Sequence, residues 1–179
     1  KPSDYCYNLA FTRKQDKVLV STKNPFTSQI SSKERIIAVL RIVHFITTLS
    51  RGGAENQLLI LCREQIRAGF EVTVVPLTGK PELVCDFYDA GVQVDLTLIN
   101  QSFLKQLVTI RKLDLKSDIW HAHLPQAELL LATTNLAPIV VTRHFGGKFY
   151  PRAPKLLSSR LSRFATRNAS GIVAVSEFV

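Results

Sequence analysis

The 179-residue chain contains no methionine, one tryptophan and only three cysteines. Cys6, Cys62 and Cys85 form no CxxC pair and leave an odd count, so neither a structural zinc site nor a disulfide framework is indicated. Cys62 and Cys85 each fall within an apolar helical pattern, where a small buried thiol is common. This cysteine usage predicts unpaired buried thiols and a reducing, cytoplasmic compartment.

Long hydrophobic runs are also missing. The apolar runs present, such as those at 58–62 and 129–132, are far shorter than the roughly 20 apolar residues that span a bilayer. Residues 1–16 are polar and have no apolar core of the kind that a signal peptide requires. We therefore predict neither a transmembrane helix nor a signal peptide.

The chain is basic, with a formal net charge of +9. Basic proteins bind nucleic acids, anionic membrane surfaces or phosphorylated ligands. The sequence has no zinc-finger spacing, no basic aromatic sheet motif and no helix-turn-helix pattern, so we expect no nucleic-acid partner. A phosphorylated ligand and an anionic membrane surface remain as interpretations of the charge, beside a merely solvated basic surface.

Two regions differ in pattern. Residues 1–38 are polar, turn-rich and weakly periodic, which predicts a poorly ordered extension. Residues 39–179 alternate between β-branched apolar runs and amphipathic helical patterns. Strands are predicted at 39–46, 71–77, 92–99, 118–123, 138–142 and 171–175, and helices at 54–68, 81–90, 102–113, 125–135 and 153–168.

Strands and helices that alternate with short connections form βαβ units. The predicted fold class is therefore α/β, a doubly wound parallel sheet of Rossmann-like type spanning residues 39–179. Ligands of such sheets bind outside the carboxyl ends of the strands, so candidate site residues are sought there.

The first candidate is the loop between the first strand and the first helix, which contains Gly52, Gly53 and Glu55. Glycines let a ligand approach the backbone, and a helix N-terminus offers free N–H groups to an anion. A tight turn that needs glycine only for its geometry is the equally supported alternative. The sequence is neither G-x-G-x-x-G nor a P-loop, which disfavours a dinucleotide cofactor and a P-loop nucleotide.

The fourth strand ends with His121 and His123, which alternation places on the same face. Two histidines could begin a metal site, but no carboxylate or cysteine nearby in the sequence completes a ligand set, so no metal is predicted. The alternative is that one histidine packs in the sheet while the other faces a cleft and bonds a substrate hydroxyl or phosphate. We favour this second interpretation, with His123 in the cleft.

The fifth strand ends with Arg143 and His144, followed by Gly146 and Gly147. Arginine suits phosphate or carboxylate, although a surface loop with an incidental basic residue would look the same. Because the carboxyl ends of parallel strands share one edge, we expect His123, Arg143 and His144 to converge with the glycine loop.

The predicted helix at 153–168 carries arginines and leucines at helical spacing. The favoured interpretation is a helix packed on the core with a solvated basic face. A basic amphipathic helix that docks on anionic lipid is the alternative.

Four segments together resemble a known family. They are IVHFITTLSRGGAENQLLIL, DIWHAHLPQAELL, PIVVTRHF and ASGIVAVSEFV, in that order between residues 41 and 179. They resemble the amino-terminal domain of the family-4 retaining glycosyltransferases, which have the GT-B fold. The resemblance leaves only the extension unmatched.

The resemblance implies an enzyme of two facing Rossmann-like domains, of which this chain is the acceptor-side half. It implies a nucleotide-sugar donor as co-substrate, no separate cofactor and no metal. The glycines matching Gly52 and Gly53 would approach the donor, and His123 would lie near the reacting sugar as the catalytic residue. Ser176 and Glu177 match residues at the edge of the cleft, and Arg143 and His144 match the family's loop more loosely.

Two hypotheses on function follow. In the first, the full-length protein transfers a sugar to a saccharide or lipid-linked acceptor in cell-envelope or polysaccharide biosynthesis, at the inner face of the membrane. The fragment would then be inactive alone, because the resemblance places the residues that hold the donor diphosphate beyond Val179. In the second, a noncatalytic Rossmann-like module binds a phosphorylated ligand.

Overall fold

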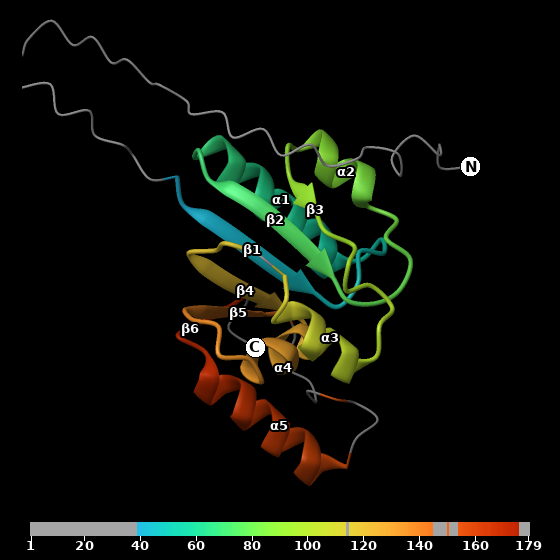
Figure 1. Ribbon diagram of the computed structural model, residues 1–179, viewed down its shortest axis with the longest axis vertical. Helices are drawn as coiled ribbons and strands as arrows, with labels where there is room; N and C mark the ends of the chain where they lie inside the picture. The colour runs from blue at the N-terminus through green and yellow to red at the C-terminus, as the bar shows by residue number, and fades with distance from the viewer. Residues whose placement is uncertain (1–38, 114, 145–149, 151–153, 176–179) are drawn as a thin grey trace, which may run out of the picture. The chain divides into compact units, whose positions relative to one another are not determined.

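The computed structural model describes residues 39–113, 115–144, 150 and 154–175 (Figure 1). These residues belong to one compact unit, Val39–Val179. The extension predicted at 1–38 lies outside the described residues, so its order and its boundary stay predictions.

Six strands and five helices alternate in the described part of the chain, and every strand pair is parallel. The strand order is β3-β2-β1-β4-β5-β6. The prediction of a doubly wound α/β fold is therefore confirmed. In chain order the elements are β1 (Arg41–Ile46), α1 (Gly53–Arg67), β2 (Glu71–Pro76), α2 (Val84–Asp89), β3 (Gln93–Val94), α3 (Phe103–Ile110), β4 (Ile119–His123), α4 (Pro125–Ala132), β5 (Ile139–Arg143), α5 (Lys155–Asn168) and β6 (Gly171–Ala174).

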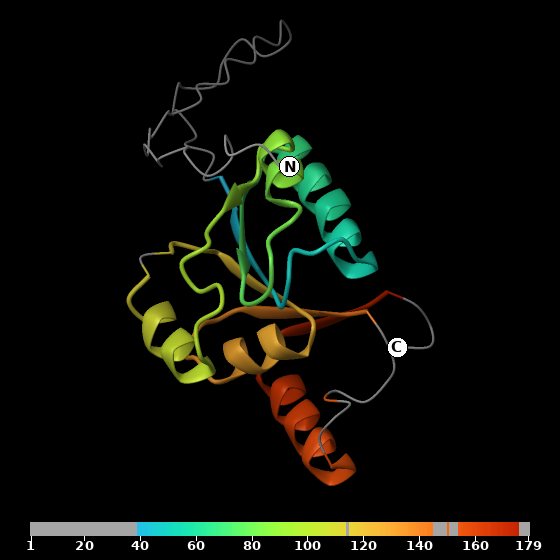
Figure 2. The same cartoon turned by 90° about the vertical axis from the view of Figure 1, so that its right-hand side faces the viewer.

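Helices α1 and α2 cover one face of the sheet, and α3, α4 and α5 lie on the other (Figures 1 and 2). Strand β1 shows how alternation divides side chains between the two faces. Val43 and Phe45 belong to the core formed with α3 and α4, whereas Ile46 belongs to the core formed with α1 and α2. His44 shares the face of Ile46 and is completely buried.

Most predicted boundaries agree with the structure to within a few residues. Ser102 caps α3 by accepting from the backbone N–H of Lys105, and Gly69 after α1 has the positive φ of +87° expected of a helix stop. The third strand is the clear difference, because it was predicted at 92–99 and contains only Gln93–Val94. Asp95 ends it, since its Oδ1 accepts from the Thr97 N–H at 2.8 Å and forms a local turn.

The cysteine prediction is correct for one residue and wrong for another. Cys62 is free and fully buried, and burial raises the pKa of its thiol to about 12. Cys85 is disulfide-bonded, so the cysteines no longer support a reducing compartment. In the described part of the chain, no helix has both the length and the apolar character needed to cross a membrane.

Candidate functional site

All four histidines of the protein lie together, although they are spread over 101 positions of the sequence from His44 to His144. His44 lies on β1, His121 and His123 on β4, and His144 directly after β5. The parallel register pairs His44 with His121. Ring centroids lie 4.2 Å apart for His121 and His123, 4.9 Å for His44 and His121, and 5.6 Å for His123 and His144. The prediction that His121 and His123 share a face is confirmed.

Three of these rings join two glutamines of α1 in a continuous hydrogen-bonded series, which we call the histidine chain. It comprises Gln65, His44, His123, His144 and Gln57. The contacts in that order are Oε1 to Nε2 at 2.8 Å, Nδ1 to Nε2 at 3.0 Å, Nδ1 to Nε2 at 3.3 Å, and Nδ1 to Oε1 at 3.0 Å. The chain begins and ends on the same helix, so α1 holds the rings across three strands.

His121 stands beside the histidine chain without belonging to it. Its Nε2 lies 2.7 Å from the hydroxyl of Thr142 on β5. Thr142 is two residues before His144 and on the same face of the sheet. His121 therefore packs against the chain and has its own polar partner.

Burial keeps these rings neutral near physiological pH. Desolvation lowers the pKa of His44 to about 4, although the hydrogen bond to Oε1 of Gln65 opposes the shift. It lowers the pKa of His121 to about 3, helped by the neighbouring histidines, and brings that of His123 well below its usual value. The pKa of His144 is also lowered by desolvation, while the Glu55 carboxylate opposes the shift.

His44, His121 and His123 are also close enough to be considered as metal ligands, with one ligand atom of each within 4.8 Å of the others. Neutral imidazoles are good ligands for zinc. However, the facing nitrogens of His44 and His123 are hydrogen-bonded at 3.0 Å, and a shared ion would have to displace that proton. The described geometry is that of rings that bond one another, and the absence of a metal stays a prediction.

The sequence predicted His123 in an open cleft, but the structure buries it. His123 is 1% exposed, and both of its ring nitrogens contact other histidines. The half-buried His144 occupies the outer position instead. Alternation identified the correct face of β4 but gave no information on what covers it.

The residue after His123 has an unusual backbone. Leu124 has a φ of 70°, a conformation that costs about 1–3 kcal/mol in a residue other than glycine. Pro125 follows as the first residue of α4, and the helical region is sterically disfavoured for a residue before proline. The backbone is therefore strained at the carboxyl end of β4. Strained residues often occur near functional sites.

The glycine loop lies at the adjacent strand end, after β1. Gly52 is the N-cap of α1, and a Cβ there would overlap Oε2 of Glu55. The Glu55 side chain is buried and accepts a hydrogen bond from the Thr48 hydroxyl. A Cβ on Gly53 would meet no atom within 4 Å. A side chain at position 52 would therefore displace the protein's own carboxylate, whereas Gly53 borders open space.

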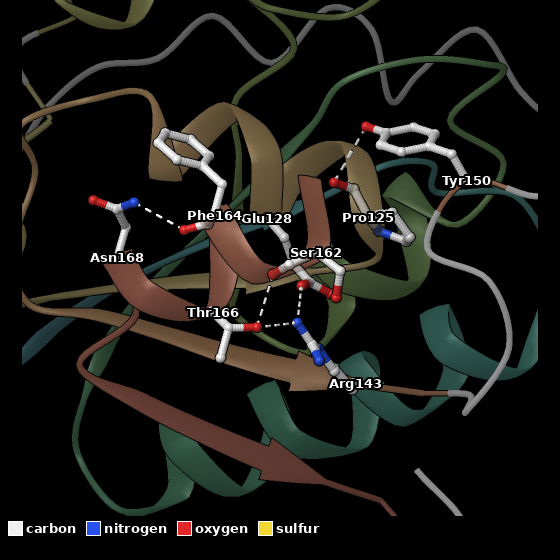
Figure 3. Close-up of polar contacts among 8 residues, drawn as sticks. All are labelled: Pro125, Glu128, Arg143, Tyr150, Ser162, Phe164, Thr166 and Asn168. Atoms are coloured by element: carbon white, nitrogen blue, oxygen red, sulfur yellow. Dashed lines mark hydrogen bonds and ion pairs between the residues drawn. The ribbon is translucent and has the colours of Figure 1, made fainter. Parts of the chain in front are cut away.

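Arg143 does not join the histidines. Its guanidinium Nη2 donates to Oγ1 of Thr166 on α5 at 2.8 Å and to Oε2 of Glu128 on α4 at 3.4 Å (Figure 3). Glu128 is 3% exposed; desolvation raises the pKa of its carboxyl group, and Arg143 opposes the rise. These contacts lie on the opposite face of the sheet from α1, so convergence with the glycine loop does not occur, and a substrate role for Arg143 stays a prediction.

The other site predictions have different outcomes. Gly52, Gly53, Glu55, His123 and His144 gather where β1 and β4 are neighbours, which is the point at which the strand order reverses and doubly wound folds bind ligands. Ser176 and Glu177 lie outside the described residues. His44, Gln57 and Gln65 were missed, although a histidine within an otherwise apolar buried strand was a signal.

The helix α5 differs from the favoured expectation. Leu161 and Ala165 pack toward α4, but Leu156, Leu157 and Phe164 are 66%, 48% and 41% exposed. Its 14 residues include no acidic side chain. Part of the apolar pattern therefore lies at the surface among arginines rather than in the core.

Comparison of the sequence with known proteins identifies the family of this chain. No curated protein gave a significant match to the chain. The model of the family described as Glycosyltransferase Family 4 matches residues 51–179, a segment that begins at the glycine loop and includes three of the four histidines. The chain belongs to glycosyltransferase family 4.

Proposed function

We propose that this chain is the acceptor-side half of a retaining GT-B glycosyltransferase. The full-length enzyme transfers a sugar from a nucleotide-sugar to a saccharide or lipid-linked acceptor, in cell-envelope or polysaccharide biosynthesis. The nucleotide-sugar is a co-substrate, and neither a metal nor a further cofactor is part of the proposal. Family membership and the grouping of the glycine loop, Glu55 and His144 at the strand-order reversal support it.

The chemistry of these groups suits a sugar ligand. The carboxylate of Glu55 can accept from sugar hydroxyls, and the imidazole of His144 can donate to or accept from a hydroxyl or phosphate. The first N–H groups of α1 have no partner within the helix and suit an anion. Glu55, in the first turn of α1, already places a negative charge there, which favours a sugar over a diphosphate beside Gly52.

His123 is the proposed catalytic residue, and its burial defines what that role requires. Both of its ring nitrogens are occupied, so a direct contact with the reacting sugar requires His144 to move aside when substrate binds. With His144 in place, the outer imidazole meets the substrate and His123 positions it. Both routes make activity depend on His123.

The test is sugar transfer by the full-length protein. We expect His123→Ala to lower kcat by about 100-fold or more, as for loss of an acid–base group. His121→Ala is the matched control, because that ring is also buried but lies outside the histidine chain, and it should retain most activity. Thermal unfolding of both variants checks folding, and NMR of the product checks retention of the anomeric configuration. Unaltered turnover by His123→Ala would refute the role of that residue.

The proposal includes an anionic membrane surface on the cytoplasmic side as a partner for α5. The exposed Leu156, Leu157 and Phe164 are interspersed with Arg160, Arg163 and Arg167 on this helix, the pattern of interfacial helices. We expect the chain to sediment with phosphatidylglycerol vesicles but not with phosphatidylcholine vesicles, and Leu157→Glu to abolish the difference. Equal sedimentation with both lipids would remove the membrane from the proposal.

A further inference from the structure

The histidine chain consists of four hydrogen bonds through three imidazoles, with a glutamine at each end. Gln57 and Gln65 are eight residues apart on α1, so they share one face of the helix about two turns apart. A glutamine amide has a carbonyl that accepts and an NH₂ that donates. The glutamine at each end of the histidine chain can therefore either accept a hydrogen bond from the neighbouring ring or donate one to it.

Counting protons restricts the arrangement. A neutral imidazole has one N–H and one acceptor nitrogen, so the three rings supply three protons for four hydrogen bonds. The fourth proton must come from a glutamine NH₂, so at one end of the histidine chain the amide nitrogen takes the place given above to Oε1, through a flip of that amide. When the rings are neutral, one glutamine therefore donates and the other accepts, and the orientations of their two amides are linked.

Only two neutral arrangements satisfy every contact. If the Gln65 carbonyl accepts from His44, then His44, His123 and His144 all have the proton on Nε2, and Gln57 donates to Nδ1 of His144. If the Gln57 carbonyl accepts from His144, all three rings have the proton on Nδ1, and Gln65 donates to Nε2 of His44. A mixture of tautomers would bring two protons or two lone pairs face to face.

We propose that Gln57 and Gln65 are positioning residues that determine, through the histidine chain, which nitrogen of His123 carries its proton. The three tautomers change together. Either glutamine of α1 can therefore determine the tautomer of His123 without touching that ring. The coupling of the three tautomers does not depend on the proposed function. Its importance for catalysis does rest on that function, because only a catalytic His123 makes the position of this proton matter for sugar transfer.

The test is NMR of ¹⁵N-histidine-labelled protein near neutral pH, since the nitrogen shifts of a neutral ring identify its tautomer. The protein has four histidines, so four rings account for the spectrum. We expect His44, His123 and His144 to show the same tautomer, or the same ratio of tautomers in rapid exchange. His121, which bonds Thr142 instead, serves as the internal control.

Two reciprocal variants extend the test. Lysine donates but cannot accept, and its charge disfavours protonation of a neighbouring ring. Gln65→Lys should therefore move all three protons to Nδ1, and Gln57→Lys should move them to Nε2. Asn56→Lys is the matched control, because it adds the same charge at an exposed neighbouring position of α1 and should change no tautomer.

Two results would overturn the proposal. One is a wild-type spectrum in which His123 has a different tautomer from His44. The other is a His123 tautomer that neither lysine variant at the chain ends changes while the variants remain folded. The NMR measurement does not require turnover, so its outcome is independent of the transfer assay. The linked tautomers can be refuted while sugar transfer is demonstrated, and they can be confirmed while sugar transfer is refuted.

Discussion

Arg143 and His144 are neighbours in the sequence and lie on opposite faces of the sheet. Arg143 contacts Glu128 and Thr166 on α4 and α5, whereas His144 contacts His123 and Gln57 on the side of α1. Arg143 forms a partly buried ion pair with Glu128, and His144 ends a series of neutral rings. Adjacent positions at a strand end can therefore differ completely in electrostatic environment.

The two groups should also respond to acid with opposite signs. The pKa of each buried histidine is lowered, so the folded state resists protonation that the unfolded state accepts. The pKa of Glu128 is raised, so the folded state takes up that proton more readily than the unfolded state. Acid therefore weakens folding through the histidines and favours it through Glu128.

The largest expected effect is the loss of stability in acid. Well above pH 6.5, His44 and His121 are uncharged in both the folded and the unfolded state, so these rings give no pH dependence of stability there. As the pH falls from 6.5 to about 4, such a ring becomes protonated in the unfolded state but stays neutral in the folded state. Each such ring then lowers the free energy of unfolding by about 1.4 kcal/mol per pH unit. Urea unfolding across this range measures the slope.

Two variants separate the contributions to that slope. His44→Gln removes one titrating ring and should reduce the acid dependence, whereas Glu128→Gln removes the opposing group and should increase it. A free energy of unfolding that stays constant between pH 6.5 and 4 would contradict the neutral state of the histidines.

The next effect concerns the ion pair. Glu128→Ala should lower the free energy of unfolding by about 2 kcal/mol, because it removes a hydrogen-bond acceptor from a partly buried guanidinium that cannot lose its charge. Glu128→Gln keeps an acceptor of the same shape and should cost less than about 1 kcal/mol. Chemical denaturation compares the two variants, and a loss below about 1 kcal/mol for Glu128→Ala would show that the pair contributes little.

A smaller effect separates the two neighbours by function. In the full-length protein, His144→Ala should lower kcat/KM by about tenfold, equivalent to about 1.4 kcal/mol. Arg143→Ala should mainly lower the unfolding temperature, since its described contacts are with α4 and α5. The opposite outcome, with substrate kinetics changed only by Arg143→Ala, would restore the substrate role predicted for that residue.

The smallest effect on stability is expected at Gly53. Because a Cβ there meets no atom within 4 Å, Gly53→Ala should leave stability unchanged or raise it by less than about 1 kcal/mol. If a ligand approaches this backbone, calorimetry with the full-length protein should still show weaker nucleotide-sugar binding. Unchanged binding would favour the alternative in which the glycine loop is only a tight turn.

Gly52→Ala provides the contrast within the same loop. Its Cβ would displace the Glu55 carboxylate, so a loss of activity there would report on Glu55 as well as on the backbone. Comparing the two alanine variants therefore distinguishes ligand approach from the internal packing of the loop.

Several features followed from local sequence alone. The alternation of apolar strands and amphipathic helices predicted the doubly wound sheet, since each βαβ unit has its own short-range pattern. Ser102 and Gly69 marked the ends of their helices through local capping. The glycine loop and His123 were correctly located at strand ends, because element order and boundaries determine that position.

Other features depended on contacts between distant segments. His44 and His123 are separated by 79 positions in the sequence, so no local pattern could indicate the centre of the histidine chain. Gln57 and Gln65 are polar positions of α1, and nothing in their local pattern distinguishes them from other polar residues of an amphipathic helix. Residues 96–99 had strand-like composition, but the short-range turn at Asp95 ended β3 before them.

By itself, the sequence determined which residues form strands and helices and which side chains stand at the strand ends, because hydrophobic periodicity and capping act over a few residues. The tertiary structure decided that His144 meets His123 while Arg143 meets Glu128, and that His123 is covered. These outcomes depend on which helix packs over each face of the sheet and on which strands become neighbours, and both are set by packing between segments far apart in the chain.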